Sequence, residues 1–324
     1  MKKYQKILII VIAVIVGLAV MKNVLIKTAV TTVGSSVVGA PIQIKKFSLG
    51  FLTQKVHIKG MTLHNPKGFP EGVLVDISEI RVDFNLGALI GGKLHLPLII
   101  FDLKQMVLIK NKDGELNVDA LKIAQAKEEP GQKEEEAKPK KSGKAMPMQI
   151  DELRLNVERV IMKDYSQGEK PVVLAYEIAL KDKVFKDIKS PEQLATLVMI
   201  QAMGPTAIQG AKIYGAATLL GAAFLPAGAV GVLVGKDSST AEYTVGYDKL
   251  YDVSLGLMKE IGQLKSEERG KGVIKANVNG SDVAIKLEQT SEKKIRMTIS
   301  ARKLMLPKPE VAGGIRFQIE EKIL

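Results

Sequence analysis

The chain of 324 residues contains no cysteine and no tryptophan, and aromatic residues make up only 5% of it. Without cysteine, it can form neither a disulfide framework nor a metal site built on thiolates. The three histidines, His57, His64 and His95, do not have the spacing of metal ligands. No serine lies in a strained nucleophile motif. The sequence therefore predicts a protein that is not an enzyme and that uses no metal and no cofactor.

Arginine is also scarce, so the formal net charge of +12 comes almost wholly from lysine. Lysine is a compact point charge, whereas arginine reads phosphate or guanine through two parallel hydrogen bonds. A surplus of lysine therefore favours attraction to an anionic membrane surface over base-specific recognition. The chain also lacks a basic cluster with interleaved aromatic residues. We expect no nucleic acid among its partners.

The first 28 residues have the pattern of a membrane anchor. Three lysines within the first six residues precede an uncharged apolar run at 7–21, and two more lysines follow it. A cleaved signal peptide is the alternative, but no small-x-small cleavage site follows the run, which favours an anchor. The lysines before the run place the N-terminus on the cytoplasmic side. The predicted anchor residues are Ile7, Ile10, Val14, Leu18 and Met21.

Short runs of alternating apolar and polar residues fill the region 29–126, and the run from Ile80 to Leu86 is the clearest. Successive strand side chains point to opposite faces, so such runs form a sheet with one apolar face. That face needs a cover, either later helices that complete an ordinary core or a bound lipid. The candidate lipid-contacting residues are Ile80, Val82, Phe84, Leu86, Leu153, Leu155 and Val157.

The turn Asn65-Pro66-Lys67-Gly68-Phe69 separates two of these strands; Pro66 fixes φ, and Gly68 adopts positive φ without cost. A second motif, Gly114-Glu115-Leu116-Asn117, follows the strand region. With the anchor and the strand opening at 38–44, these elements resemble the AsmA family over about residues 1–121. The resemblance implies an inner-membrane-anchored periplasmic protein implicated in outer-membrane biogenesis. Longer members resemble bridge-like lipid-transfer proteins, whose sheet curls into an apolar groove.

The segment 127–147 is rich in Lys, Glu and Pro and almost free of large apolar residues. Such a segment cannot bury enough apolar surface to offset its ordering entropy, so we expect a disordered linker. Alternation resumes at 148–190, where the sheet is expected to continue.

The segment 191–236 is predicted as an apolar, helical region rich in Gly and Ala, with a first helix from Pro191 to about Met203. No charge appears from 213 to 234, but Pro226 interrupts this stretch. Three interpretations stay open: a second membrane crossing, a re-entrant hairpin bent at Pro226, or helices that cover the apolar face of the sheet. A complete second crossing would return the rest of the chain to the cytoplasm.

A small α+β module is predicted for 237–324. Its expected order is a strand at 240–245, an amphipathic helix at 247–261, strands at 273–278, 283–287 and 295–300, and a last helix. Asn279-Gly280 is a strong hairpin signal between the first two of the three strands. From about residue 216 onward, this order resembles a small family of bacterial lipoproteins of unknown function, and the resemblance implies no chemistry.

The predicted fold class is therefore α+β: an N-terminal membrane helix, a curved antiparallel β-sheet that forms a groove with covering helices, and a small α+β C-terminal module. The predicted location is the inner membrane, with a single crossing and the bulk of the chain in the periplasm. The predicted function is to hold or transfer lipid, with membrane phospholipid as the partner. The alternative is a membrane-anchored scaffold that binds another envelope protein and no lipid.

Overall fold

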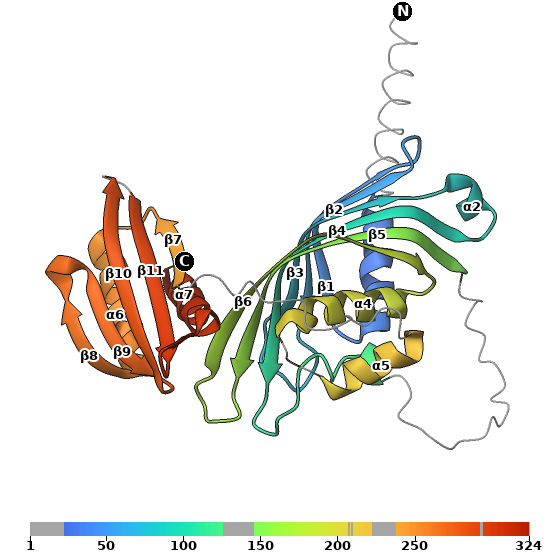
Figure 1. Cartoon of the computed structure of the whole chain (residues 1–324). Helices are drawn as coiled ribbons and strands as arrows, with labels where there is room; N and C mark the ends of the chain where they lie inside the picture. The colour runs from blue at the N-terminus through green and yellow to red at the C-terminus, as the bar shows by residue number, and fades with distance from the viewer. Residues whose placement is uncertain are drawn as a thin grey trace, which may run out of the picture.

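The computed structural model describes residues 23–125, 146–206, 208, 210–221, 238–291 and 294–323. Two sheets of six strands each, together with helices, form the described part, which confirms the predicted α+β class (Figure 1). Sheet A follows the chain in the order β1-β2-β3-β4-β5-β6, and sheet B contains β7 to β12.

Sheet A contains β1 (Ile42–Gly50), β2 (Lys55–His64), β3 (Val73–Asp83), β4 (Leu94–Lys110), β5 (Met148–Asp164) and β6 (Val172–Ile188). The predicted antiparallel pairing holds for the other neighbouring strands of sheet A, but β4 and β5 pair in parallel, from Leu94 opposite Met148 to Lys110 opposite Asp164. A parallel pair requires the chain to return to the starting edge, and the long connection 111–147 allows this return. Strands β5 and β6 thus extend the sheet begun by β1–β4.

The apolar face of sheet A is kept continuous by an irregularity in β3. The register of β3 against β4 shifts on both sides of Ile77, so that Ser78 is left without a partner in the ladder. Its hydroxyl donates to the carbonyl of Asp102 at 3.1 Å. The extra residue changes the phase of alternation, so Ile77 and Ile80 both enter the core. Such bulges also bend a strand, and Figure 1 shows sheet A curving around its covering helices.

Four helices lie against this apolar face: a helix over 23–38, α3 (Lys122–Gln125), α4 (Pro191–Met203) and α5 (Ala211–Gly221). The predicted helix from Pro191 to Met203 is confirmed; the hydroxyl of Ser190 caps it by accepting from Gln193 N at 3.0 Å. In α5, Ile213 is fully buried in the core of sheet A. The described part of the apolar stretch at 213–234 is therefore a covering helix, and residues 222–234 lie outside the described part.

The described residues include no helix with the length and apolarity that a bilayer crossing requires. The predicted anchor residues at 7–21 lie outside the described residues.

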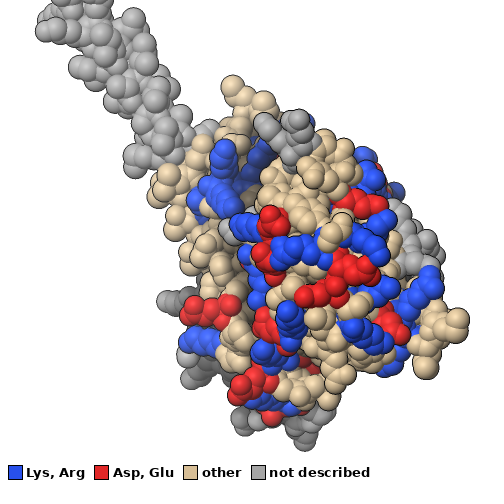
Figure 2. All heavy atoms as spheres, turned by 90° about the vertical axis from the view of Figure 1, so that its left-hand side faces the viewer, with Lys and Arg blue, Asp and Glu red and all other residues tan. Residues whose placement is uncertain are grey.

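Sheet B comprises β7 (Ser238–Tyr243), β8 (Gln263–Glu268), β9 (Val273–Val278), β10 (Ser281–Ser291), β11 (Lys294–Lys303) and β12 (Leu306–Pro307). Helices α6 (Tyr247–Ile261) and α7 (Pro309–Ile323) cover its inner face, and short helices α2 (Leu86–Ile90), η1 (Gly204–Thr206) and η3 (Arg269–Lys271) complete the described elements. The helix predicted at 247–261 and the strands predicted within 273–300 are confirmed. Figure 2 shows lysine and arginine interspersed with acidic residues over the side that faces the viewer there.

Helix α7 connects the two sheets because its side chains pack in the core of sheet B and against the outer face of sheet A. Ile315 and Ile319 pack inside sheet B, whereas Phe317 packs with Ile161 and Val173 on the outer face of sheet A, opposite the covering helices. Figure 1 shows α7 between sheet B and the start of β6.

Polar contacts surround this apolar seam. The Arg316 guanidinium binds Glu177 of β6 at 2.8 Å, and Lys163 of β5 binds Glu321 at 3.1 Å. The hydroxyl of Tyr243 donates to Glu320 at 3.0 Å, and burial, the main cause, raises the pKa of Tyr243. The seam between the sheets therefore has an apolar centre and a charged border.

Candidate functional site, an apolar groove

An apolar groove lies between the helix over 23–38 and α4, where the two helices leave part of sheet A uncovered. Its floor is formed by β2, β3 and β4 and includes Met61, Leu63, Val75, Ile77, Phe101 and Leu103. One wall includes Val33 and Val37, and the other includes Leu194, Ala195 and Val198. The volume is about 280 Å³.

None of the described residues that line this groove has a polar side chain. A cavity holds water only where polar groups offer it hydrogen bonds, so the groove favours hydrocarbon over water. A water molecule occupies about 30 Å³, and a methylene group is of similar size. The volume of about 280 Å³ therefore suits a single stretch of hydrocarbon chain.

The seven candidate lipid-contacting residues lie on or against the apolar core of sheet A, but none of them lines the groove. Leu153, Leu155 and Val157 are fully buried in β5, which α4 covers. Ile80 and Phe84 are buried, and Val82 and Leu86 are partly buried against the same core. The groove begins on the other side of the bulge at Ser78, at Ile77 and Val75. Alternation alone did not single out these floor residues, because Val75 and Ile77 alternate in the same way as Ile80 and Val82.

Over β2 and β3, the outer face of sheet A is charged, in contrast to the groove. Lys59, Glu79 and Arg81 lie there on β2 and β3, with Glu79 3.5 Å from Lys59. A hydrogen bond with His57 is the main cause that holds the pKa of Glu79 below its usual value. Over these strands, the groove side of the sheet therefore favours hydrocarbon, and the outer side favours water.

The turn motif Asn65, Pro66, Gly68 and Phe69 is fixed by side-chain hydrogen bonds. Asn65 Nδ2 donates to the carbonyl of Pro70 at 2.8 Å, and Gly68 adopts a φ of +93°. Asn65 Oδ1 accepts from Asn117 Nδ2 at 2.9 Å. The two motifs that carry the AsmA resemblance, 52 residues apart in sequence, are thus joined directly.

Asn117 is fully buried and joins three segments. Its Nδ2 also donates to the carbonyl of Val107 at 2.9 Å, and its Oδ1 accepts from Ile109 N at 3.0 Å. The side chain thereby holds the end of β4 against the turn at Asn65, beside the chain that leads into α3.

At the ends of β1 to β4 that lie beside α2, which we call the α2 edge, sheet A carries exposed apolar side chains. Leu52 in the β1–β2 turn is 100% exposed, and Ile90 at the end of α2 is 80% exposed. Antiparallel pairing from β1 to β4 places both connections at this edge. The described part of the helix over 23–38 starts there too, since Asn23 Oδ1 accepts from Leu49 N at 3.2 Å. The segment predicted as an anchor therefore precedes this edge in the chain.

Comparison with curated proteins and with solved structures finds no match. The model of the AsmA family matches residues 1–219, which include all of sheet A and both walls of the groove. Membership of this family is associated with the bacterial envelope and with outer-membrane assembly. Since the match covers most of the chain, the protein belongs to the AsmA family.

Proposed function

We propose that this protein is a non-enzymatic envelope protein, anchored in the inner membrane with its bulk in the periplasm, that holds or transfers lipid in support of outer-membrane biogenesis. The observation that carries the proposal is the wholly apolar groove between the helix over 23–38 and α4. A groove without polar groups gains nothing from water, and a lipid acyl chain is the common envelope component that fits it.

The expected binding energy supports an acyl chain as the ligand. Each buried methylene contributes about 0.8 kcal/mol, so about ten methylenes contribute about 8 kcal/mol before the cost of immobilising the chain. Among the residues that the structure describes, none that lines the groove offers a charged or hydrogen-bonding side chain to a headgroup. We therefore expect binding to depend on chain length and to vary little with the headgroup.

The exposed apolar edge of sheet A supports a membrane-proximal groove. Leu52 and Ile90 lie at the α2 edge, where the described part of the helix over 23–38 starts, and that helix also forms a wall of the groove. Exposed apolar side chains at a turn are suited to the headgroup region of a bilayer. Such an edge would let an acyl chain pass from the bilayer to the groove with little contact with water.

Filling the groove tests the proposal. Ala195 is partly exposed and faces the groove from α4, so Ala195→Phe would occupy the space without adding charge or removing a contact. We expect this variant to retain about tenfold less phospholipid after purification than the original protein, measured by mass spectrometry of extracted lipid. We also expect the delipidated variant to unfold at a higher temperature, because the phenyl ring fills an empty space.

Val184→Phe is the matched control, because Val184 is 44% exposed on β6 and does not line the groove. It should leave the retained phospholipid unchanged. A purified protein that carries no phospholipid, or equal amounts in both variants, would contradict the proposal.

A scaffold that binds another envelope protein is the second candidate. The coverage of much of the apolar face favours it, since Met199 and Ile213 from the covering helices are buried in the same core as β5. This function predicts that a fully delipidated protein keeps its fold and that one envelope protein co-purifies with it in a fixed ratio.

A further inference from the structure

The hairpin of β11 and β12 exposes three consecutive large apolar side chains, two in its turn and one at the start of β12. Leu304 is 90% exposed, Met305 is 88% exposed and Leu306 is 65% exposed. This turn lies in sheet B, outside the region that the AsmA family model matches. Isolated exposed apolar residues are common on protein surfaces, but three in sequence at the tip of a hairpin form a continuous apolar projection.

The backbone of this turn is unfavourable for the residues it holds. Arg302 pairs with Pro307 and Lys303 with Leu306, and both Leu304 and Met305 have positive φ, +50° and +67°. In the same sheet, the β9–β10 turn adopts similar angles, +50° and +76°, with Asn279 and Gly280. Those are the residues that such a turn favours, whereas left-handed conformations are unfavourable for other residues. Strain of this kind is typical of a functional site.

Positive charge surrounds the apolar tip. Arg302 and Lys303 precede it, Lys308 follows it, and no acidic residue lies between 302 and 309. Lys265 and Lys275 border a shallow hollow that also includes Met305, with Asp282 as the acidic residue there. Asp282 binds Lys265 at 2.5 Å, and Lys308 lies 3.6 Å from Glu310. Cations therefore outnumber carboxylates around the turn.

We propose that the β11–β12 turn is a docking site for an anionic lipid surface. An apolar tip with a lysine-rich border is the combination that enters a headgroup region, where apolar burial and attraction to anionic lipid add together. The turn projects outward, whereas a protein partner would have to supply a groove of matching shape. Lysine needs no such match, because it acts as a point charge.

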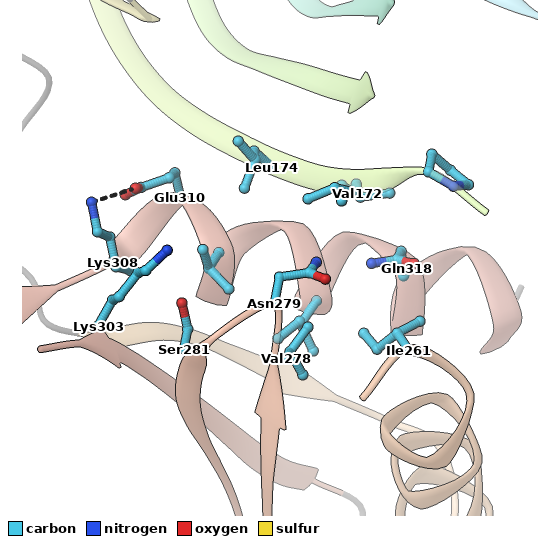
Figure 3. Close-up of a pocket in the computed structure, with 14 residues that line it drawn as sticks. Val172, Leu174, Ile261, Val278, Asn279, Ser281, Lys303, Lys308, Glu310 and Gln318 are labelled. Atoms are coloured by element: carbon cyan, nitrogen blue, oxygen red, sulfur yellow. Dashed lines mark ion pairs between the residues drawn. The ribbon is translucent and has the colours of Figure 1, made fainter. Parts of the chain in front are cut away.

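The β11–β12 turn lies at the end of the molecule opposite the α2 edge. Lys303 and Lys308 line a cavity of about 250 Å³ together with Val172 and Leu174 at the start of β6 (Figure 3). The other end of β6 is Ile188, which pairs with Ile150 near the start of β5 and so lies at the α2 edge. A strand rises about 3.3 Å per residue, so the 17 residues of β6 separate these ends by up to about 55 Å. The turn is therefore placed to meet a second lipid surface. This inference rests on the proposed function, in which the α2 edge lies at the inner membrane.

Vesicle capture tests the docking site. The full-length protein is placed in phosphatidylcholine nanodiscs on beads, and fluorescent phosphatidylcholine vesicles are added with or without phosphatidylglycerol. We expect capture of the vesicles that contain phosphatidylglycerol, weakened by salt. The double variant Leu304→Asn/Met305→Gly restores the residues that the turn favours, so it should fold at least as well. It should reduce capture by about tenfold or more.

Leu219→Asn is the matched control, because Leu219 is also largely exposed, at 67%, but lies on α5, outside sheet B. This control should leave vesicle capture unchanged. Ala195→Phe, which fills the groove, should also leave capture unchanged, so failure of the docking proposal can be told apart from failure of the groove proposal. If the protein does not enter nanodiscs, the anchor is refuted, and flotation of the free protein with the same vesicles tests the turn. Absence of capture, equal capture of neutral vesicles, or equal capture by the double variant would overturn the proposal.

Discussion

The substitution Gly314→Ala is expected to destabilise the protein by about 3 kcal/mol or more and to detach α7 from β6. A Cβ at Gly314 would overlap the carbonyl of Val173, and one at Gly313 would lie 2.9 Å from the carbonyl oxygen of Ala175. Both obstacles are backbone atoms of a central part of the seam, so they cannot move aside as a flexible side chain does. The two glycines thus set how closely the helix approaches the sheet.

Urea denaturation measures this effect, and limited proteolysis between the sheets detects the detachment. Gly256→Ala is the matched control: Gly256 lies within α6, and a Cβ there would meet no described residue outside its own stretch of helix. This control should stabilise the protein by up to about 1 kcal/mol, because alanine favours a helix more than glycine does. Equal stability of the two variants would show that the glycine contact is not essential.

Asn117→Asp should also destabilise the protein by about 3 kcal/mol or more. The Nδ2 of Asn117 donates to two acceptors, the carbonyl of Val107 and Oδ1 of Asn65. A carboxylate cannot donate to them, and it would bring a buried negative charge against two oxygen atoms. The end of β4 would then lose its connection to the turn at Asn65.

Asn111→Asp provides the same chemical change in the same connection. Asn111 Oδ1 accepts from Asp113 N at 3.0 Å and from Glu115 N at 2.8 Å, and a carboxylate accepts both bonds equally well. Asn111 Nδ2 also donates to Glu115 Oε2 at 3.3 Å, but this bond is exposed to water, so its loss costs little. We expect a change in unfolding free energy within about 0.5 kcal/mol for this control, measured by the same urea titration. A similar loss in both variants would contradict the role assigned to the Asn117 amide.

The sequence predicted the elements whose limits depend on local signals. Helix α6 has the predicted limits because its amphipathic pattern lies between Gly246 and Gly262. Helix α4 starts where Ser190 and Pro191 indicate a start. Strand β8 was missed because its side chains are polar and almost all exposed, so it has no apolar alternation to detect.

The features that depend on distant contacts were not predictable in the same way. Alternation specifies which face of a strand is buried but not the direction of its neighbour, so the parallel pairing of β4 with β5 was missed. The sequence predicted an apolar face and its cover, but the position of the groove depends on where α4 and the helix over 23–38 end their coverage. The exposed Leu304-Met305 turn gave no signal, since its apolar residues continue the pattern of a strand.

The placement of α7 has a consequence for synthesis of the protein. Strand β6 ends at Ile188, whereas α7 begins at Pro309, so β6 leaves the ribosome long before the helix that covers its outer face. During translation, Val173 and Ile161 are therefore open to chaperones and to neighbouring nascent chains. The outer face of the sheet that carries the groove is therefore covered only after α7, a helix that packs in the core of sheet B, has been synthesised.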